Sequence, residues 1–365
     1  MNYFLPTKFI SGENTIINNA DKIAAFGKHC LIVTGGNSAK RCGALDDVLK
    51  ALEMHGVKHS IYDAVKPNPT IECVIEGGRF ASQEGCDFVI GIGGGSPLDA
   101  AKVIAISAAN PELDRDGLYS MNWPNKRLPL VLVGTTAGTG SEMTPISVIT
   151  DLDGRKRSFK GDSIYADLSM GDARYTMSMP LSVTTSTAVD ALAHCLESYF
   201  SKNATAISKG VALEGMLMLK EPLKGLAEGK LPSEEERHQI YDASILGGIA
   251  ISITATNLGH NLGYYLTESH NVPHGFACAT CLPALIDHGF ECAPEYAAEL
   301  CRLLNMSKEE FKALIKTLTP DFGVKLSAEE IEALLPRWEN VPNLQATLGG
   351  VTIEEVRKIL TEKIG

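Results

Sequence analysis

The chain has 365 residues, of which 44% are hydrophobic and 21% charged, and these values fit a globular protein with room for two domains. The net charge of −11 and the lack of a Lys/Arg block argue against a general nucleic-acid-binding protein. The N-terminus has no basic and apolar leader, and no run of about 18 apolar residues follows it, so we expect neither a signal peptide nor a membrane partner. Nine scattered cysteines indicate reduced thiols and a cytoplasmic protein.

In the first half of the chain, short apolar runs alternate with helical patterns. Strands are predicted at 30–34, 60–63, 87–92 and 130–133, and helices at 44–55 and 71–84. Thr70 follows a Pro-Asn-Pro segment and is the expected N-cap of the second helix. This alternation predicts a parallel sheet with helices on both faces. Ligands of such sheets bind at the carboxyl ends of the strands.

The second half has helical periodicity and almost no strand signal. Helices are predicted at 187–200, 206–223, 234–255 and 259–268, and in several segments between 294 and 363. Pro180 and the polar run at 182–186 mark the expected boundary. We therefore predict an α/β domain at residues 1–181 and a helical domain at 182–365, with the ligand site in the cleft between them.

A glycine-rich loop follows the strand predicted at 87–92. Gly93, Gly94 and Gly95 are followed by Ser96 and Pro97, where a helix is expected to begin. Glycines let a backbone approach a phosphate closely, and a helix N-terminus offers free N–H groups. The loop is neither G-x-G-x-x-G nor a P-loop, and a plain connecting turn is the alternative, but three glycines in a row favour phosphate binding. A second loop at 134–142, rich in Thr, Ser and Gly, is weaker evidence because such runs are common in loops.

One carboxylate and three imidazoles form a candidate metal site. Asp190 and His194 stand four residues apart and share one helix face, although a structural histidine remains an equal alternative for this pair. With His260 and His274 they would supply three nitrogens and one oxygen, a set that suits Fe²⁺ or Zn²⁺. A net charge of about +1 would then polarise a substrate oxygen. The histidines interpreted as surface or core residues are His29, His55, His59, His238 and His288, and the pair Cys278 and Cys281 is interpreted as core packing.

These motifs, in this order, resemble the iron-containing alcohol dehydrogenases over nearly the whole chain. Residues 93–99 match the GGGSxxD loop of that family, and residues 135–142 match its TTAGTGSE loop. Asp190-x-x-x-His194, His260 and Pro273-His274-Gly275 match its metal motif. The start of the chain, at 6–14, is similar to the opening strands of the family.

The resemblance implies an α/β N-terminal Rossmann-like dinucleotide-binding domain plus an all-α C-terminal metal-binding domain, the fold shared with dehydroquinate synthase. It implies hydride transfer between NAD(P)(H) and a small primary alcohol or aldehyde, with Asp190, His194, His260 and His274 as ligands of Fe²⁺ or, alternatively, Zn²⁺. The implied cofactor-binding residues are Gly94, Gly95, Ser96, Asp99, Thr135, Thr136, Thr139, Thr144 and Lys156, with Lys160 competing for the role of Lys156. A metal-free reductase, a dehydroquinate synthase-like lyase and a non-catalytic nucleotide-binding protein are the alternatives.

The residues expected to move the proton depart from the family pattern. Many members carry a second histidine four residues after the first C-terminal metal ligand, and Tyr264 stands there in this chain. A phenol relays a proton only if its pKa is strongly perturbed. His270, four residues before His274, is the other candidate for the catalytic proton relay.

The second departure concerns the choice of cofactor. Members that prefer NAD usually place an acidic residue directly after the strand predicted at 30–34, where it binds the ribose 2′-hydroxyl. This chain has glycines there, followed by Asn37 and Ser38, with Lys40 and Arg41 close by. We therefore expect Gly36, Asn37 and Ser38 to lie at the cofactor and NADP(H) to be favoured over NAD(H), although a plain Gly-Gly turn is the alternative.

The substrate is the least determined feature of the sequence. Phe159, Leu262 and Tyr264 are expected pocket walls, and Lys160 would suit an anionic aldehyde if it were not simply solvated. The resemblance also implies a homodimer that pairs through the N-terminal strands.

Overall fold

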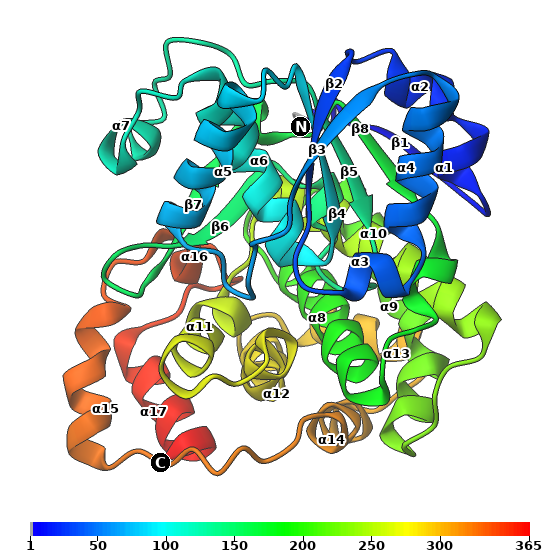
Figure 1. Cartoon of the computed structure of the whole chain (residues 1–365). Helices are drawn as coiled ribbons and strands as arrows, with labels where there is room; N and C mark the ends of the chain where they lie inside the picture. The colour runs from blue at the N-terminus through cyan, green and yellow to red at the C-terminus, as the bar shows by residue number, and fades with distance from the viewer. Residues whose placement is uncertain (1–2) are drawn as a thin grey trace. The chain divides into compact units, whose positions relative to one another are not determined.

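The computed structural model describes residues 3–365. The chain divides into two compact units, one ending at Met179 and the other running over Pro180–Gly365 (Figure 1). The first unit contains a parallel sheet with flanking helices, and the second is helical. The predicted architecture is confirmed.

A six-stranded, fully parallel sheet forms the centre of the first unit, in the order β1-β8-β5-β4-β2-β3. Its strands are β1 (Lys8–Ser11), β2 (His29–Val33), β3 (Lys58–Tyr62), β4 (Phe88–Gly93), β5 (Leu130–Gly134) and β8 (Leu168–Gly171). A separate antiparallel hairpin is made by β6 (Ile146–Thr150) and β7 (Lys156–Lys160). The four strands predicted from apolar runs are β2, β3, β4 and β5, whereas β6, β7 and β8 have too little apolar periodicity to be predicted.

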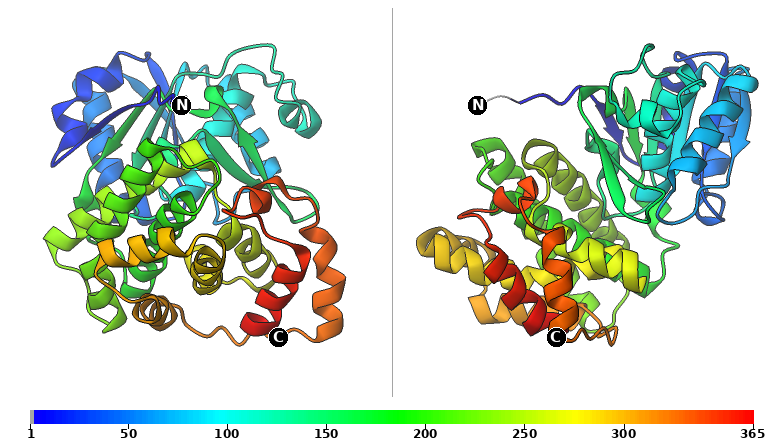
Figure 2. Two further views of the ribbon diagram at one scale, coloured as in Figure 1. Left: turned by 180° about the vertical axis from the view of Figure 1, so that it is seen from behind. Right: turned by 90° about the vertical axis from the view of Figure 1, so that its left-hand side faces the viewer.

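Helices cover both faces of this sheet because its strands alternate between two apolar cores. Helices lie on both sides of the sheet (Figure 2). Leu31 and Leu132 belong to a core shared with α5 (Ile71–Gln83) and α6 (Gly95–Ala109), while Ile32 and Val133 belong to a second core on the other face, shared with α4 (Ala44–Met54). Thr70 caps α5 by accepting a hydrogen bond from the Cys73 N–H, as predicted. The helices of this unit are α1 (Thr15–Asn18), α2 (Ala20–Ala24), α3 (Ser38–Arg41), α4 (Ala44–Met54), α5 (Ile71–Gln83), α6 (Gly95–Ala109) and α7 (Arg115–Tyr119).

The strand order reverses between β2 and β4. The chain leaves β2 toward β3 on one side and leaves β4 toward β5 on the other. In parallel sheets the crevice at such a reversal binds nucleotides at the carboxyl ends of the strands. The loops after β2 and β4 both begin at this point, and they carry three of the predicted cofactor residues, Gly36, Asn37 and Gly94.

The second unit is built around the buried helix α8 (Leu181–Tyr199), which packs against α9 (Ala206–Ala227), α10 (Glu234–Thr254) and α12 (His274–Cys292). Helix α11 (Leu258–His270) packs against α12. The remaining helices are α13 (Pro294–Leu304), α14 (Lys308–Leu318), α15 (Ala328–Leu334), α16 (Pro342–Gln345) and α17 (Ile353–Ile364). No helix within residues 3–365 is both long enough and apolar enough to cross a membrane.

The start of α8 differs from the prediction. The polar run at 182–186, expected to mark the boundary ahead of a helix at 187–200, forms the first turns of α8. Thr184 and Thr185 donate their hydroxyl hydrogens to the carbonyls four residues earlier, at 3.0 and 2.9 Å, so these polar side chains are satisfied within the helix. The predicted ranges also omit α12, whose apolar sequence carries little helical periodicity because the helix is buried on nearly all sides.

Candidate metal centre and cofactor loops

Helix α8 presents three ionisable side chains toward one place. Asp190, His194 and Glu197 follow one another at intervals of four and three residues, so they share a helix face. All three are buried, with at most 4% of the residue surface exposed. Buried charges require partners, and the partners here come from α11 and α12.

The two further histidines stand near the N-terminal ends of their helices. Asn257 caps α11, its side chain accepting from the Leu258 N–H at 2.7 Å, and His260 lies in the first turn. His274 is the first residue of α12. Gly275 permits the close packing of α12 on α8, since a Cβ at Gly275 would lie 1.8 Å from the Ser186 carbonyl oxygen.

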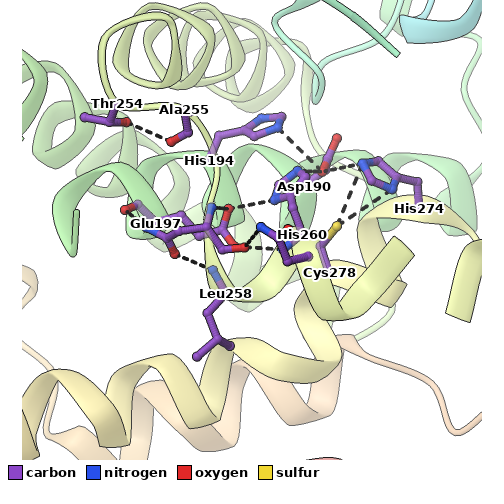
Figure 3. Close-up of polar contacts among 11 residues, drawn as sticks. Asp190, His194, Glu197, Thr254, Ala255, Leu258, His260, His274 and Cys278 are labelled. Carbon is purple, nitrogen blue, oxygen red and sulfur yellow. Dashed lines mark hydrogen bonds and ion pairs between the residues drawn. The ribbon is translucent and has the colours of Figure 1, made fainter. Parts of the chain in front are cut away.

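The three imidazoles converge on a single carboxylate oxygen (Figure 3). The Nε2 atoms of His194, His260 and His274 lie 3.9, 3.6 and 3.9 Å from Asp190 Oδ1. Neighbouring donors in a tetrahedral shell with ligand bonds of about 2.1 Å lie about 3.4 Å apart. The observed separations are therefore close to those of a metal shell, and the structure brings the four predicted ligands together.

Two of these candidate ligand atoms form no hydrogen bond within the protein. Asp190 Oδ1 and His260 Nε2 are fully buried without a hydrogen bond, an arrangement that costs free energy unless a ligand satisfies it. Burial by itself would lower the pKa of His260, but Cys278, Glu197 and Asp190 raise it well above the ordinary range. The surroundings thus favour positive charge at this point, and the donor set fits a divalent cation.

Glu197 fixes the orientation of His260 and was not predicted from the sequence. Its Oε2 accepts from His260 Nδ1 at 2.7 Å, and its Oε1 accepts from the His260 backbone N–H at 2.8 Å. With the hydrogen on Nδ1, the lone pair of Nε2 points toward Asp190. Carboxylates of this kind support many metal-binding histidines, and the signal in the sequence is that Glu197 stands seven residues, or two helical turns, after Asp190.

Cys278 is the second residue missing from the prediction. It is buried on α12, one turn after His274, and Asp190, His260, His274 and Cys278 offer ligand atoms that all lie within 4.8 Å of one another. Cys281 is likewise buried on α12, as predicted for both cysteines, but it does not belong to this group of donors.

The glycine loop and the threonine loop of the first unit pack directly on each other. A Cβ on Gly94 would meet Thr136 Oγ1 at 3.0 Å, and a Cβ on Gly95 would meet Thr139 Cγ2 at 2.9 Å. Gly94 precedes α6 and provides no side-chain cap, so the first N–H groups of this long helix are available to an anion. The loops that begin at Gly94 and Thr135 thus leave two adjacent strands, β4 and β5, and Ser96 lies in the first turn of α6.

Asp99 and Thr144 serve to connect these loops. Asp99 accepts from the Ser141 hydroxyl at 2.6 Å and from the Val148 N–H at 2.8 Å. The buried Lys102 ammonium donates to the Ser141 carbonyl at 2.7 Å and to Thr144 Oγ1 at 3.2 Å. Both predicted cofactor residues are thus engaged in protein contacts that shape the loop, and their contact with a cofactor stays a prediction.

The buried Lys102 also makes the free energy of unfolding depend on pH. Burial lowers its pKa from 10.5 to about 8, against the opposing effect of Asp99 and Glu142. Between these two pH values the folded protein binds fewer protons than the unfolded chain, so this group makes stability rise as the pH rises through the interval.

The chain matches a single family along both units. Residues 6–173 match the family described as "Iron-containing alcohol dehydrogenase", and residues 184–332 match "Fe-containing alcohol dehydrogenase family, C-terminal". A solved iron-containing alcohol dehydrogenase from Thermotoga maritima is 34% identical, with a TM-score of 0.91, over 100% of this chain and 99% of that one. The protein belongs to the iron-containing alcohol dehydrogenase family.

Curated relatives give the class of reaction. The chain is 29% identical to an NADPH-dependent butanol dehydrogenase of Clostridium saccharobutylicum, over 80% of this chain and 76% of the relative. It is also 29% identical to a lactaldehyde reductase of Escherichia coli K12, over 93% of this chain and 91% of the relative. This iron-containing alcohol dehydrogenase is therefore an oxidoreductase of the alcohol dehydrogenase and aldehyde reductase class, as predicted.

The structure places the two candidates for the proton relay differently. The Tyr264 ring stacks on His274 with centroids 5.7 Å apart and meets His260 edge-on at 6.2 Å. His270 is exposed at the last position of α11, and its Nε2 lies 3.3 Å from the Tyr265 hydroxyl. Ten residues of helix, about 15 Å, separate it from His260, so Tyr264 is the candidate at the metal centre.

Most of the other predicted residues lie in the first unit of this iron-containing alcohol dehydrogenase, whereas Leu262 is buried on α11 in the second unit. Gly36, Asn37 and Ser38 are exposed directly beyond β2. Lys156 is half-buried on β7, and Lys160 at the other end of that strand is exposed. Phe159 is completely buried and stacks on Tyr119 at 4.7 Å, so it belongs to the core and is unsuited to the pocket wall expected of it.

Proposed function

We propose that this protein is a metal-dependent aldehyde reductase and alcohol dehydrogenase that uses NADP(H) and acts on small primary alcohols or their aldehydes. The observation that carries the metal dependence is the convergence of three histidine nitrogens on Asp190 Oδ1, together with the absence of any hydrogen bond to that buried oxygen. Asp190, His194, His260 and His274 are the proposed ligands of Fe²⁺, with Zn²⁺ as the alternative. In a metal-free reductase, burying these ligand-type side chains without a bound cation would only cost free energy.

The chemistry divides between the metal, the cofactor and the protein. A divalent ion supplies Lewis-acid polarisation of a carbonyl oxygen, and the nicotinamide supplies the hydride. The protein's own residues hold these groups and handle the proton. Glu197 keeps the His260 hydrogen on Nδ1, as its 2.7 Å contact supports, and Tyr264 is the proposed proton relay because its ring lies against both His260 and His274.

The glycine and threonine loops are the proposed cofactor site. Gly94, Gly95 and Ser96 would hold the pyrophosphate at the N-terminus of α6, where the absence of a capping side chain supports anion binding. The other proposed cofactor contacts are Asp99, Thr135, Thr136, Thr139, Thr144 and Lys156.

The preference for NADP(H) is proposed from the loop after β2. Ser38, Lys40 and Arg41 are exposed there, and no carboxylate stands between 34 and 41. An acidic residue at Gly35 would be obstructed, because its Cβ would lie 2.3 Å from the Val65 carbonyl oxygen. We expect the double change Lys40→Ala and Arg41→Ala to raise the KM for NADPH about tenfold or more and to leave the KM for NADH unchanged. The loss of one charged contact, about 1.5 kcal/mol, corresponds to a change of this size. A wild-type enzyme that clearly prefers NADH would contradict the proposal.

Activity is tested most directly by NADPH oxidation at 340 nm with a panel of small aldehydes, using protein loaded with Fe²⁺ or Zn²⁺ and protein stripped by a chelator. We expect turnover only with metal. His194→Ala should lose metal and turnover while still binding NADPH, because His194 and the cofactor loops belong to different folded units. Full turnover by the stripped protein would refute metal dependence.

We further propose a cytoplasmic homodimer. All nine cysteines are free thiols, which suits a reducing compartment. Strand β1 lies at the edge of the sheet, where its unpaired backbone groups are suited to pairing with a second copy. Light scattering of the purified protein tests the dimer.

A further inference from the structure

Helix α12 carries a second ligand-type side chain beside the metal centre. Cys278 stands one turn after His274, so the two side chains share a helix face. Its Sγ lies 3.7 Å from Nδ1 and 3.8 Å from Nε2 of His274 (Figure 3). The residue is completely buried.

The sulfur has the spacing of a metal ligand. The donor atoms of Asp190, His260, His274 and Cys278 lie within 4.8 Å of one another, and two of them, Asp190 Oδ1 and His260 Nε2, are buried without a hydrogen bond. With bonds of about 2.1 Å to nitrogen and about 2.3 Å to sulfur, adjacent donors in a shell of four or five ligands lie about 3.1–3.6 Å apart. The 3.8 Å between Sγ and His274 Nε2 is close to the upper end of this range. Because Sγ is almost equidistant from both ring nitrogens, ligation requires the thiol to turn toward the Nε2 side.

We propose that Cys278 is an additional, sulfur ligand of the metal that Asp190 and the histidines hold. This inference rests on the proposed function, because it presupposes a bound metal. As the sulfur–metal bond forms, the S–H bond breaks and the proton leaves to solvent. The site then contains two anionic ligands, so the net charge of a divalent centre falls from +1 to zero and burial of the ion becomes less unfavourable.

A thiolate also changes which metals bind. Sulfur is a soft ligand and favours ions such as Zn²⁺ over Mg²⁺ or Mn²⁺, which prefer oxygen. We therefore expect this centre to bind Zn²⁺ and Co²⁺ in preference to Mg²⁺ and Mn²⁺.

Cobalt reports sulfur ligation directly. The full-length protein is stripped with a chelator and titrated with Co²⁺ while its absorption spectrum is recorded. We expect a thiolate-to-cobalt charge-transfer band in the near-ultraviolet for the wild type and for Cys281→Ser, which removes a buried thiol from the same helix. In Cys278→Ser the band should disappear. The affinity for Co²⁺ should fall about tenfold or more, because loss of even an outer-sphere partner typically costs that much.

X-ray absorption of the Zn²⁺-loaded wild type provides a test that needs no variant, and it decides the matter should Cys278→Ser fail to fold. We expect a sulfur neighbour at about 2.3 Å. Cobalt binding without the charge-transfer band, a band that persists in Cys278→Ser, or a zinc shell of nitrogen and oxygen alone would each overturn the role of Cys278 and leave the proposed function standing. Failure of the wild type to bind either metal would overturn both.

Discussion

Glu197→Gln changes a single group behind the metal centre while preserving the shape of the side chain. The Glu197 carboxylate accepts three hydrogen bonds, from His260 Nδ1 at 2.7 Å, the His260 N–H at 2.8 Å and the Asn257 N–H at 3.1 Å. A glutamine has one acceptor oxygen and one NH₂ group, so one orientation places NH₂ against the His260 N–H. The other places it against the Asn257 N–H and His260 Nδ1, which moves the imidazole hydrogen to Nε2, the atom proposed to bind the metal.

The expected size of the effect follows from these contacts. Loss of a carboxylate behind a metal-binding histidine weakens metal affinity about 10- to 100-fold, equivalent to about 1.4–2.8 kcal/mol. In either orientation the glutamine NH₂ group faces a buried backbone N–H, so two hydrogen-bond donors are left without an acceptor. This should also lower the free energy of unfolding by about 1–3 kcal/mol.

Competition for Zn²⁺ with a chromophoric chelator measures the affinity, and circular dichroism confirms that the variant is folded. Glu221→Gln, which removes an exposed carboxylate from α9, is the matched control and should bind Zn²⁺ like the wild type. A folded Glu197→Gln protein with wild-type affinity for Zn²⁺ would refute the assigned role of Glu197.

Three further predictions test other parts of the structure. Gly275→Ala should force α12 away from α8 and abolish tight Zn²⁺ binding. Gly210→Ala, on α9 with open space around the added Cβ, should bind Zn²⁺ normally and be stabilised by about 0.5–1 kcal/mol. Equal Zn²⁺ affinities of the two variants would contradict the packing argument. Lys102→Met should remove the stabilisation that the wild type gains as the pH rises from about 8 to 10.5. Urea unfolding across this range should show that the free energy of unfolding of the wild type, minus that of the variant, increases with pH. A constant difference would count against the assignment. Tyr264→Phe should lower kcat and alter its pH profile with the Zn²⁺ affinity unchanged, while Tyr265→Phe should leave kcat unchanged. A fully active Tyr264→Phe enzyme would show that Tyr264 is not the proton relay and that water supplies the proton.

The cofactor loops show how far sequence patterns reach. Three glycines after a strand predicted a turn whose backbone can approach a phosphate closely. In the structure, Gly94 and Gly95 leave room for Thr136 and Thr139 of the neighbouring loop, and phosphate binding stays a prediction. That Asp99 is held by Ser141 and Val148 could not be predicted, because these partners lie 42 and 49 residues away along the chain.

By itself the sequence determined the family, the two kinds of architecture and the four proposed metal ligands, because strand and helix periodicity and motif spacing are local properties. Only the tertiary structure decided that Glu197 orients His260, that Cys278 faces the metal centre while Cys281 lies outside it, and that Tyr264 rather than His270 lies beside the proposed ligands. Each of these depends on which helix faces meet when α8, α11 and α12 pack. That packing is set by the burial of many side chains at once, and no spacing within a single helix encodes it.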